Sequence, residues 1–271
     1  TGDTGDTGDT GDTGDTGLDP YLTLSYPFDN YVLDNVSSSN NLIPITSSSH
    51  SFSTDGVSNS SILFNGIDDG LMINTYNNPE EFTVSLWLKT GDDSGRAIAH
   101  EWGEGPWVIY KNSGEIKVMV IPENRIASEV ISIGWPIGNE WNHIIFTYSN
   151  LTGRGILYVN GIERGSFLRK MEQSKFYSNS PLKIGGISQS SERLSGNIDE
   201  LKIYNTVLTS KEVLQKYNEY SFKYQIIEGS YSWEEARLDA ISRGGRLAVI
   251  NSSEMNDQLI AQFDNTFLPY L

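Results

Sequence analysis

The sequence has no cysteine, no long apolar run and few basic residues, and each absence excludes a class of function. Without cysteine, the 271-residue chain has no disulfide, no thiolate zinc site and no cysteine nucleophile. No apolar run approaches the ~18 residues of a membrane-spanning helix, so we expect no membrane insertion. A net charge of −16 argues against a nucleic-acid partner, because phosphate binding needs clustered Lys and Arg.

The chain begins with a strict repeat. Residues 1–17 read TGDTGDTGDTGDTGDTG, and Gly at every third position is what the crowded axis of a collagen triple helix requires. The tract resembles the collagen-like regions of bacterial and giant-virus surface proteins. It has no proline, and a flexible acidic linker is the alternative interpretation. Because the chain starts inside the repeat and lacks an initiator Met, we expect it to be a fragment of a longer protein.

The repeat also predicts an oligomeric state. If it ends a longer triple helix, the parent protein is a homotrimer, since a triple helix needs three chains. The fragment itself is predicted to be a monomer with a disordered tract. So few triplets, with Asp in each one, do not offset the cost of ordering three chains.

Short alternating segments follow the repeat and predict an antiparallel β-sandwich. Apolar residues occupy every second position of FTVSLWLK (82–89), which is the period of a strand with one buried face. Comparable candidate strands are 22–28, 61–66, 107–111, 115–121, 141–149, 155–161, 181–186 and 197–205. One helical pattern spans residues 209–220, where Thr209 and Glu212 form a capping box.

Five motifs occur in order between residues 22 and 220. They are YPFDN (26–30), SILFNGIDDGLMI (61–73), FTVSLWLKT (82–90), WNHIIFTYS with ILYVNG (141–161) and GNIDELKIYNTVLTSKEV (196–213). Together they resemble the laminin G-like group of the concanavalin A-like jelly rolls. This resemblance implies an all-β antiparallel β-sandwich over residues 18–221.

The C-terminal segment resembles a different family. GSYSWEEARLDAISRGGRLAVINSSEMNDQL (229–259) is similar to the N-terminal part of a C-type lectin-like domain. Ser232 and Glu235 form a capping box at the start of its predicted helix. Ala240 stands where the family usually has a cysteine, and the half of that family that binds sugar and calcium has no counterpart in this sequence. Residues 222–271 are therefore predicted to be a truncated α+β segment to which no lectin activity is assigned.

Two aspartates are the candidate metal ligands. The laminin G-like resemblance implies a structural Ca²⁺ held by an Asp of the closing strand and by main-chain carbonyls near the first strand. Asp199 and Asp29 occupy these positions, and carboxylate oxygens suit this hard cation. The alternative is that Asp199 solvates a strand edge and Asp29 begins a turn with Asn30.

Four tryptophans are the candidate ligand-binding residues, because aromatic rings on exposed positions stack against sugars. They are Trp87, Trp102, Trp107 and Trp135. Packing in the interior of the sandwich is the alternative role for each of them.

No catalytic arrangement is present. Retaining glycosidases need two carboxylates ~5–5.5 Å apart, whereas Glu101 and Glu104 fall on opposite faces of a strand. The three histidines are scattered, and His143 is predicted to pack within its strand. We therefore expect a non-catalytic adhesion module that is extracellular, on a cell surface or on a virion, and that binds carbohydrate or a glycoprotein surface. A structural spacer is the alternative, and a polysaccharide hydrolase or lyase is a third.

Overall fold

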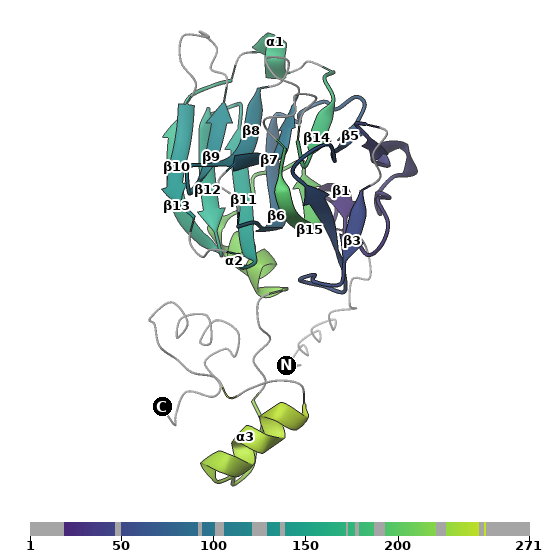
Figure 1. The fold of residues 1–271 in the computed structure, drawn as a ribbon. Coiled ribbons are helices and arrows are strands. Elements are labelled where there is room, and N and C mark those ends of the chain that lie inside the picture. The colour runs from purple at the N-terminus through teal and green to yellow at the C-terminus, as the bar shows by residue number, and fades with distance from the viewer. Residues whose placement is uncertain are drawn as a thin grey trace, which may run out of the picture. The chain divides into compact units, whose positions relative to one another are not determined.

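The computed structural model describes a β-sandwich of two antiparallel sheets, which confirms the predicted all-β fold class (Figure 1). The structure describes residues 19–46, 50–91, 94–100, 106–120, 129–135, 139–171, 173–176, 179–186, 193–220, 226–243 and 247. The N-terminal repeat and Trp102 lie outside the described residues, so the predictions made for them stay predictions.

Among the described residues, sheet A has eight strands. Its strand order is β13-β12-β11-β6-β15-β4-β3, and β1 pairs with β15. Its strands are β1 (Leu22–Tyr26), β3 (Ser51–Ser53), β4 (Ser61–Asn65), β6 (Glu81–Lys89), β11 (Asn142–Ser149), β12 (Arg154–Val159), β13 (Ile162–Leu168) and β15 (Ser195–Tyr204).

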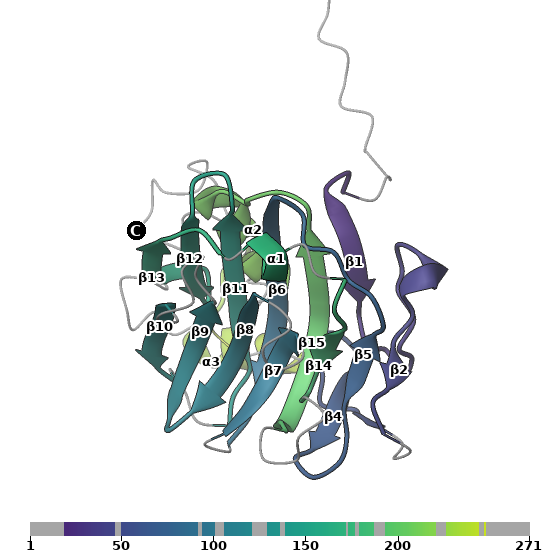
Figure 2. The same ribbon diagram turned by 90° about the horizontal axis from the view of Figure 1, so that it is seen from above.

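Sheet B lies against sheet A as the second layer (Figure 2). Its order is β10-β9-β8-β7-β14-β5-β2. Its strands are β2 (Ile43–Pro44), β5 (Leu71–Ile73), β7 (Ser94–His100), β8 (Trp107–Asn112), β9 (Glu115–Val120), β10 (Glu129–Gly134) and β14 (Leu182–Ile184). The helices are η1 (Ser38–Asn40), α1 (Gln173–Phe176), α2 (Ser210–Asn218) and α3 (Trp233–Ser242).

The core lies between the sheets and is rich in aromatic rings. The Phe82 ring of β6 contacts the rings of Trp107, Phe146, Tyr148 and Phe176 at centroid distances of 5.4–6.4 Å. Such pairs add to the stabilisation that burial of apolar area provides. The contact between Phe82 and Trp107 therefore connects β6 of sheet A to β8 of sheet B across the core.

Both predicted capping boxes are present. Thr209 Oγ1 accepts from the Glu212 amide at 3.3 Å, and Glu212 Oε2 accepts from the Thr209 amide at 2.7 Å. Ser232 and Glu235 form the same reciprocal pair at the start of α3. These bonds satisfy amides that have no partner within the helix itself.

The chain divides into two compact units, Thr1–Val213 and Leu214–Leu271. The predicted boundary between residues 221 and 222 stays a prediction, as does the C-type lectin-like assignment. In the described part of the chain, no helix is both long and apolar enough to cross a bilayer.

Candidate functional site

Strand β6 is buried on both faces, which corrects the expectation of a half-buried strand. Its inward residues Phe82, Val84, Leu86 and Leu88 are fully buried. The outward residues Thr83, Ser85 and Trp87 are at most 4% exposed. The outer face of sheet A is therefore covered at β6, and two segments lie against this face.

The first segment is apolar, and we call it the helix cover (residues 205–213, from the end of β15 into α2). Leu208 and Val213 pack against Ile145, Tyr158 and Tyr204 of the sheet. The Tyr158 and Ser210 hydroxyls are 3.2 Å apart. This cover is an ordinary hydrophobic contact between a sheet and the segment that follows it.

The second segment is polar, and we call it the loop cover (residues 54–60, between β3 and β4). Asp199 of β15 holds it through backbone amides. Asp199 Oδ2 accepts from Val57 N at 2.7 Å and from Ser58 N at 3.2 Å, while Oδ1 accepts from Glu200 N at 2.8 Å. Asp199 thus lies on a central strand and is completely buried, so the alternative interpretation, in which it solvates a strand edge, is wrong.

Asp29, which follows β1, holds the other end of the same loop. Asp29 Oδ1 accepts from Ser60 N and Oδ2 accepts from Asn59 Nδ2, both at 3.2 Å. Ser60 Oγ donates to the Phe28 carbonyl at 3.1 Å. The two aspartates selected from the sequence therefore bind one loop, although they are 170 residues apart (199 − 29 = 170).

Several residues beside these contacts have positive φ angles. The φ angles of Phe28, Asn30, Asn59 and Glu200 are 57°, 64°, 55° and 48°, in the left-handed region that non-glycine residues rarely occupy. Glu200 lies at the irregularity where β15 shifts its pairing with β6 between Asp199 and Lys202. Strained residues of this kind persist where surrounding contacts hold them, and they cluster at functional sites.

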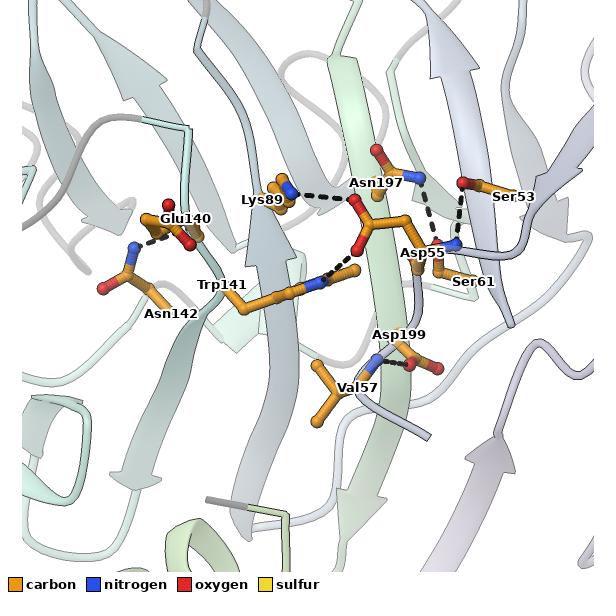
Figure 3. Close-up of polar contacts among 10 residues, drawn as sticks. All are labelled: Ser53, Asp55, Val57, Ser61, Lys89, Glu140, Trp141, Asn142, Asn197 and Asp199. Atoms are coloured by element: carbon orange, nitrogen blue, oxygen red, sulfur yellow. Dashed lines mark hydrogen bonds and ion pairs between the residues drawn. The ribbon is translucent and has the colours of Figure 1, made fainter. Parts of the chain in front are cut away.

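A third aspartate fastens the loop cover to the rim of sheet A (Figure 3). Asp55 Oδ2 lies 2.7 Å from Lys89 Nζ, and Asp55 Oδ1 accepts from Trp141 Nε1 at 3.1 Å. Ser61 Oγ donates to the Asp55 carbonyl at 2.5 Å and accepts from Asn197 Nδ2 at 3.0 Å. The hydrogen bond from Lys89 is the main cause that lowers the pKa of Asp55.

The outer face of sheet A also buries a serine–histidine pair. His143 Nε2 lies 2.8 Å from Ser85 Oγ, and the His143 ring stacks on Trp87 at 4.8 Å. Ser85 and His143 are at most 3% exposed, and burial lowers the pKa of His143 to about 3. His143 packs within its strand, as predicted.

The pKa of the Asp199 carboxyl is unusually high. Burial raises its pKa to about 7, and three backbone hydrogen bonds offset this only in part. In the described part of the chain Asp199 forms no ion pair, although Glu200 beside it pairs with Lys202 at 2.9 Å. A buried carboxylate without a countercharge takes up a proton or gains from a cation.

The carboxylates of Asp29 and Asp199 are of the ligand type that a hard cation takes, although their partners among the described residues are N–H donors. Each carboxylate oxygen accepts hydrogen bonds here, and a carboxylate offers about four lone-pair positions in all. The described residues contain no cluster of three or more His, Asp or Glu arranged for a metal. A cation would therefore depend on these two carboxylates and on main-chain carbonyls such as that of Phe28.

Two of the four candidate tryptophans are buried, in agreement with the alternative role of interior packing. Trp107 is 2% exposed in the core, and its Nε1 donates to Asn78 Oδ1 at 2.7 Å. Trp87 is 4% exposed against His143. The prediction that these two rings are exposed is wrong, because Trp107 points between the sheets and the outward face of β6 is covered. Trp135 is half-buried with Lys111 Nζ 5.3 Å from its ring centre, and a ligand role for it stays a prediction.

Sequence reasoning did not select Asp55 or Trp141. Asp55 precedes Gly56, and a Cβ at Gly56 would come within 2.7 Å of the Ser60 backbone. The Asp-Gly pair between two strands signals a tight turn, but it does not say what the Asp side chain contacts.

A family model described as the concanavalin A-like lectin/glucanases superfamily, of the laminin G type, matches residues 65–214. This match covers more than half of the chain. The chain belongs to this superfamily. No curated protein matches the chain.

Solved structures share the fold at low sequence identity. The receptor binding domain of botulinum neurotoxin D matches with a TM-score of 0.59 and 17% identity, over 73% of this chain and 52% of that chain. The binding domain of Paraclostridial Mosquitocidal Protein 1 matches with a TM-score of 0.59 and 19% identity, over 74% and 52%. The binding domain of botulinum neurotoxin DC, in complex with rat synaptotagmin II, matches with a TM-score of 0.58 and 16% identity, over 74% and 52%. The chain spans about half the length of these structures, and the likeness shows the fold alone.

Proposed function

We propose that this chain is a non-catalytic, extracellular binding module that recognises carbohydrate or a glycosylated protein surface. The observation that carries the proposal is that polar contacts hold a loop against the outer face of sheet A. Asp29 and Asp199 bind the amides of the loop cover, and Asp55 of that loop pairs with Lys89 and accepts from Trp141, which leaves a half-exposed polar rim at the end of the sheet. The similar structures are binding domains by their own descriptions, which agrees with this role by analogy of fold only.

The arrangement of the described residues argues against catalysis. Ser85 and His143 resemble a nucleophile with its base, but both are closed to solvent. A histidine with a pKa of about 3 is a poor general base near neutral pH, since efficient bases have pKa values close to the working pH. We therefore assign the pair to packing.

A calcium ion at Asp29 and Asp199 is the second part of the proposal. The ion would supply the positive charge that buried Asp199 lacks among the described residues, and it would join the first and last strands through the loop cover.

The proposal is tested by binding of the full chain to a glycan array and to intact cells at millimolar calcium. We expect binding to a restricted set of glycans. An array and cells that both stay blank would contradict the proposal and favour a spacer. New reducing ends after incubation with β-glucans or alginates would instead show a hydrolase or lyase.

A further inference from the structure

We use the name rim for Asp55, Lys89, Trp141 and Asn197, beside the loop cover. In it, the indole N–H of Trp141 donates a hydrogen bond to the Asp55 carboxylate. The Asp55 side chain is 51% exposed and that of Lys89 is 19% exposed. Trp141 and Asn197 are half-buried beside them. Figure 3 shows the four side chains converging from the loop cover, β6, the segment before β11, and β15.

We propose that Asp55, Trp141 and Asn197 form a subsite for a neutral sugar. Both oxygens of Asp55 are oriented, one by Lys89 Nζ and the other by Trp141 Nε1. Each oxygen keeps further lone-pair capacity, so the carboxylate can accept hydrogen bonds from vicinal hydroxyl groups. Asn197 uses one N–H on Ser61 Oγ and has a second donor and a carbonyl oxygen.

An aromatic ring next to such groups suits a pyranose, which has apolar C–H faces and polar edges. The Trp141 indole supplies the apolar surface, and its bond to Asp55 fixes the ring relative to the carboxylate. A preorganised subsite of this kind loses little freedom on binding.

The charge near the rim selects against anionic ligands. Asp55 is balanced by Lys89, while Glu140 is exposed nearby and the whole chain carries a net charge of −16. Sulfated or sialylated glycans would therefore be repelled at moderate ionic strength. The ligand class is a neutral hexose or N-acetylhexosamine.

This inference rests on the proposed function and is tested on its own by NMR of the ¹⁵N-labelled full chain. The indole N–H signal of Trp141 is assigned with Trp141→Phe. Glucose, galactose, mannose and N-acetylglucosamine are then added separately, with N-acetylneuraminic acid as the anionic comparison. We expect at least one neutral sugar to shift the Trp141 signal, and the anionic sugar to leave it unchanged.

The affinity for that sugar is then measured in Asp55→Asn and in Glu115→Gln. Glu115 is a matched control, because it is a similarly exposed carboxylate that pairs with Lys117 at 3.0 Å on sheet B. Asp55→Asn should weaken binding about tenfold by removing a charged acceptor, whereas Glu115→Gln should leave it unchanged.

Three results would overturn the subsite. They are no shift with any neutral sugar, a shift confined to another tryptophan, or equal affinity of Asp55→Asn and wild type. A glycan array that remains positive in any of these cases would leave the proposed function standing. A shift caused by the anionic sugar alone would show that the assigned ligand class is wrong.

Discussion

The helix cover and the loop cover lie on the same face of sheet A but are held by opposite chemistry. Leu208 and Val213 hold the helix cover by burying apolar side chains against the sheet. Asp29 and Asp199 hold the loop cover by accepting hydrogen bonds from its amides, and Asp55 of the loop pairs with Lys89 of the sheet. The first kind of contact is insensitive to protons and cations, whereas the second responds to both.

The difference assigns separate roles to the two covers. The helix cover stabilises the sandwich under any condition in which the sandwich is folded. The loop cover depends on the charge state of Asp199, whose burial is only partly offset by hydrogen bonds. Binding activity that varies with pH or calcium would therefore originate at the loop cover.

The largest effect is expected in the helix cover. Leu208→Ala should lower the free energy of unfolding by about 3 kcal/mol, because it removes a side chain that is 5% exposed and leaves a cavity. The loss should be the same near pH 5 and pH 8. Denaturant unfolding measures it, and Leu151→Ala, at a 61% exposed leucine, should change stability by less than about 0.5 kcal/mol. A loss of stability that depends strongly on pH would contradict the conclusion that apolar packing alone holds the helix cover.

Calcium should act on the loop cover alone. Binding to the folded state stabilises it by about 2.7 kcal/mol at a hundredfold excess over Kd, which raises the melting temperature relative to EDTA. Asp199→Asn should lose this shift, while Asp239→Asn, in α3, should keep it. Equal melting temperatures of the wild type in EDTA and in millimolar calcium would rule out the ion.

The pH dependence of the free energy of unfolding, measured in EDTA, should show the contribution of the Asp199 carboxyl. Its folded-state pKa of about 7 lies above the ordinary value of 3.8, so the folded state binds the proton more tightly. The stabilisation is complete below the ordinary value and is lost as the pH rises through about 7. Relative to Asp199→Asn, the wild type should lose about 2 kcal/mol between about pH 4 and pH 6, and the loss should continue up to about pH 7.

His143 supplies the opposite slope in both proteins, which is why the comparison with Asp199→Asn is needed. Burial lowers its pKa from 6.5 to about 3, so its contribution is present above the ordinary value and is lost as the pH falls. A constant difference between wild type and Asp199→Asn across the range would contradict the assigned charge state of Asp199.

The smallest effect on stability is expected at the rim. Asp55→Asn removes a half-exposed ion pair with Lys89 and should cost less than about 1 kcal/mol, falling further in high salt. Denaturant unfolding at low and high salt measures it, with Glu115→Gln as the control. A larger loss would mean that Asp55 carries much of the loop cover's stability.

Much of sheet A follows from its sequence. The alternation in 82–89 gives a strand whose inward residues form the core, and β15 includes most of the predicted strand 197–205. These features are local, since a strand's period and its apolar face lie within a few residues. The capping boxes of α2 and α3 are local in the same way.

The covers and the rim are not local, and the sequence did not predict them. Asp199 meets Val57 across 142 positions, and Trp141 meets Asp55 across 86. The alternation of apolar and polar residues in β8 also led to a wrong prediction for Trp107. This residue lies on the same face of the strand as Ile109 and Lys111. That lysine is 4% exposed, with its ammonium near Trp135, so a charged residue occupies an inward position of β8. Period two alone does not reveal which face of such a strand is the inner one.

Amide hydrogen exchange at Val57, Ser58 and Ser60 tests most directly whether Asp199 and Asp29 hold the loop cover. If sheet A carboxylates hold the loop cover, these amides exchange slowly in the wild type, because each donates to Asp199 or Asp29. Asp199→Ala should then speed exchange at Val57 and Ser58 but leave the paired β6 and β11 amides protected. Fast exchange of all three loop amides in the wild type would show that these carboxylates do not hold the loop cover.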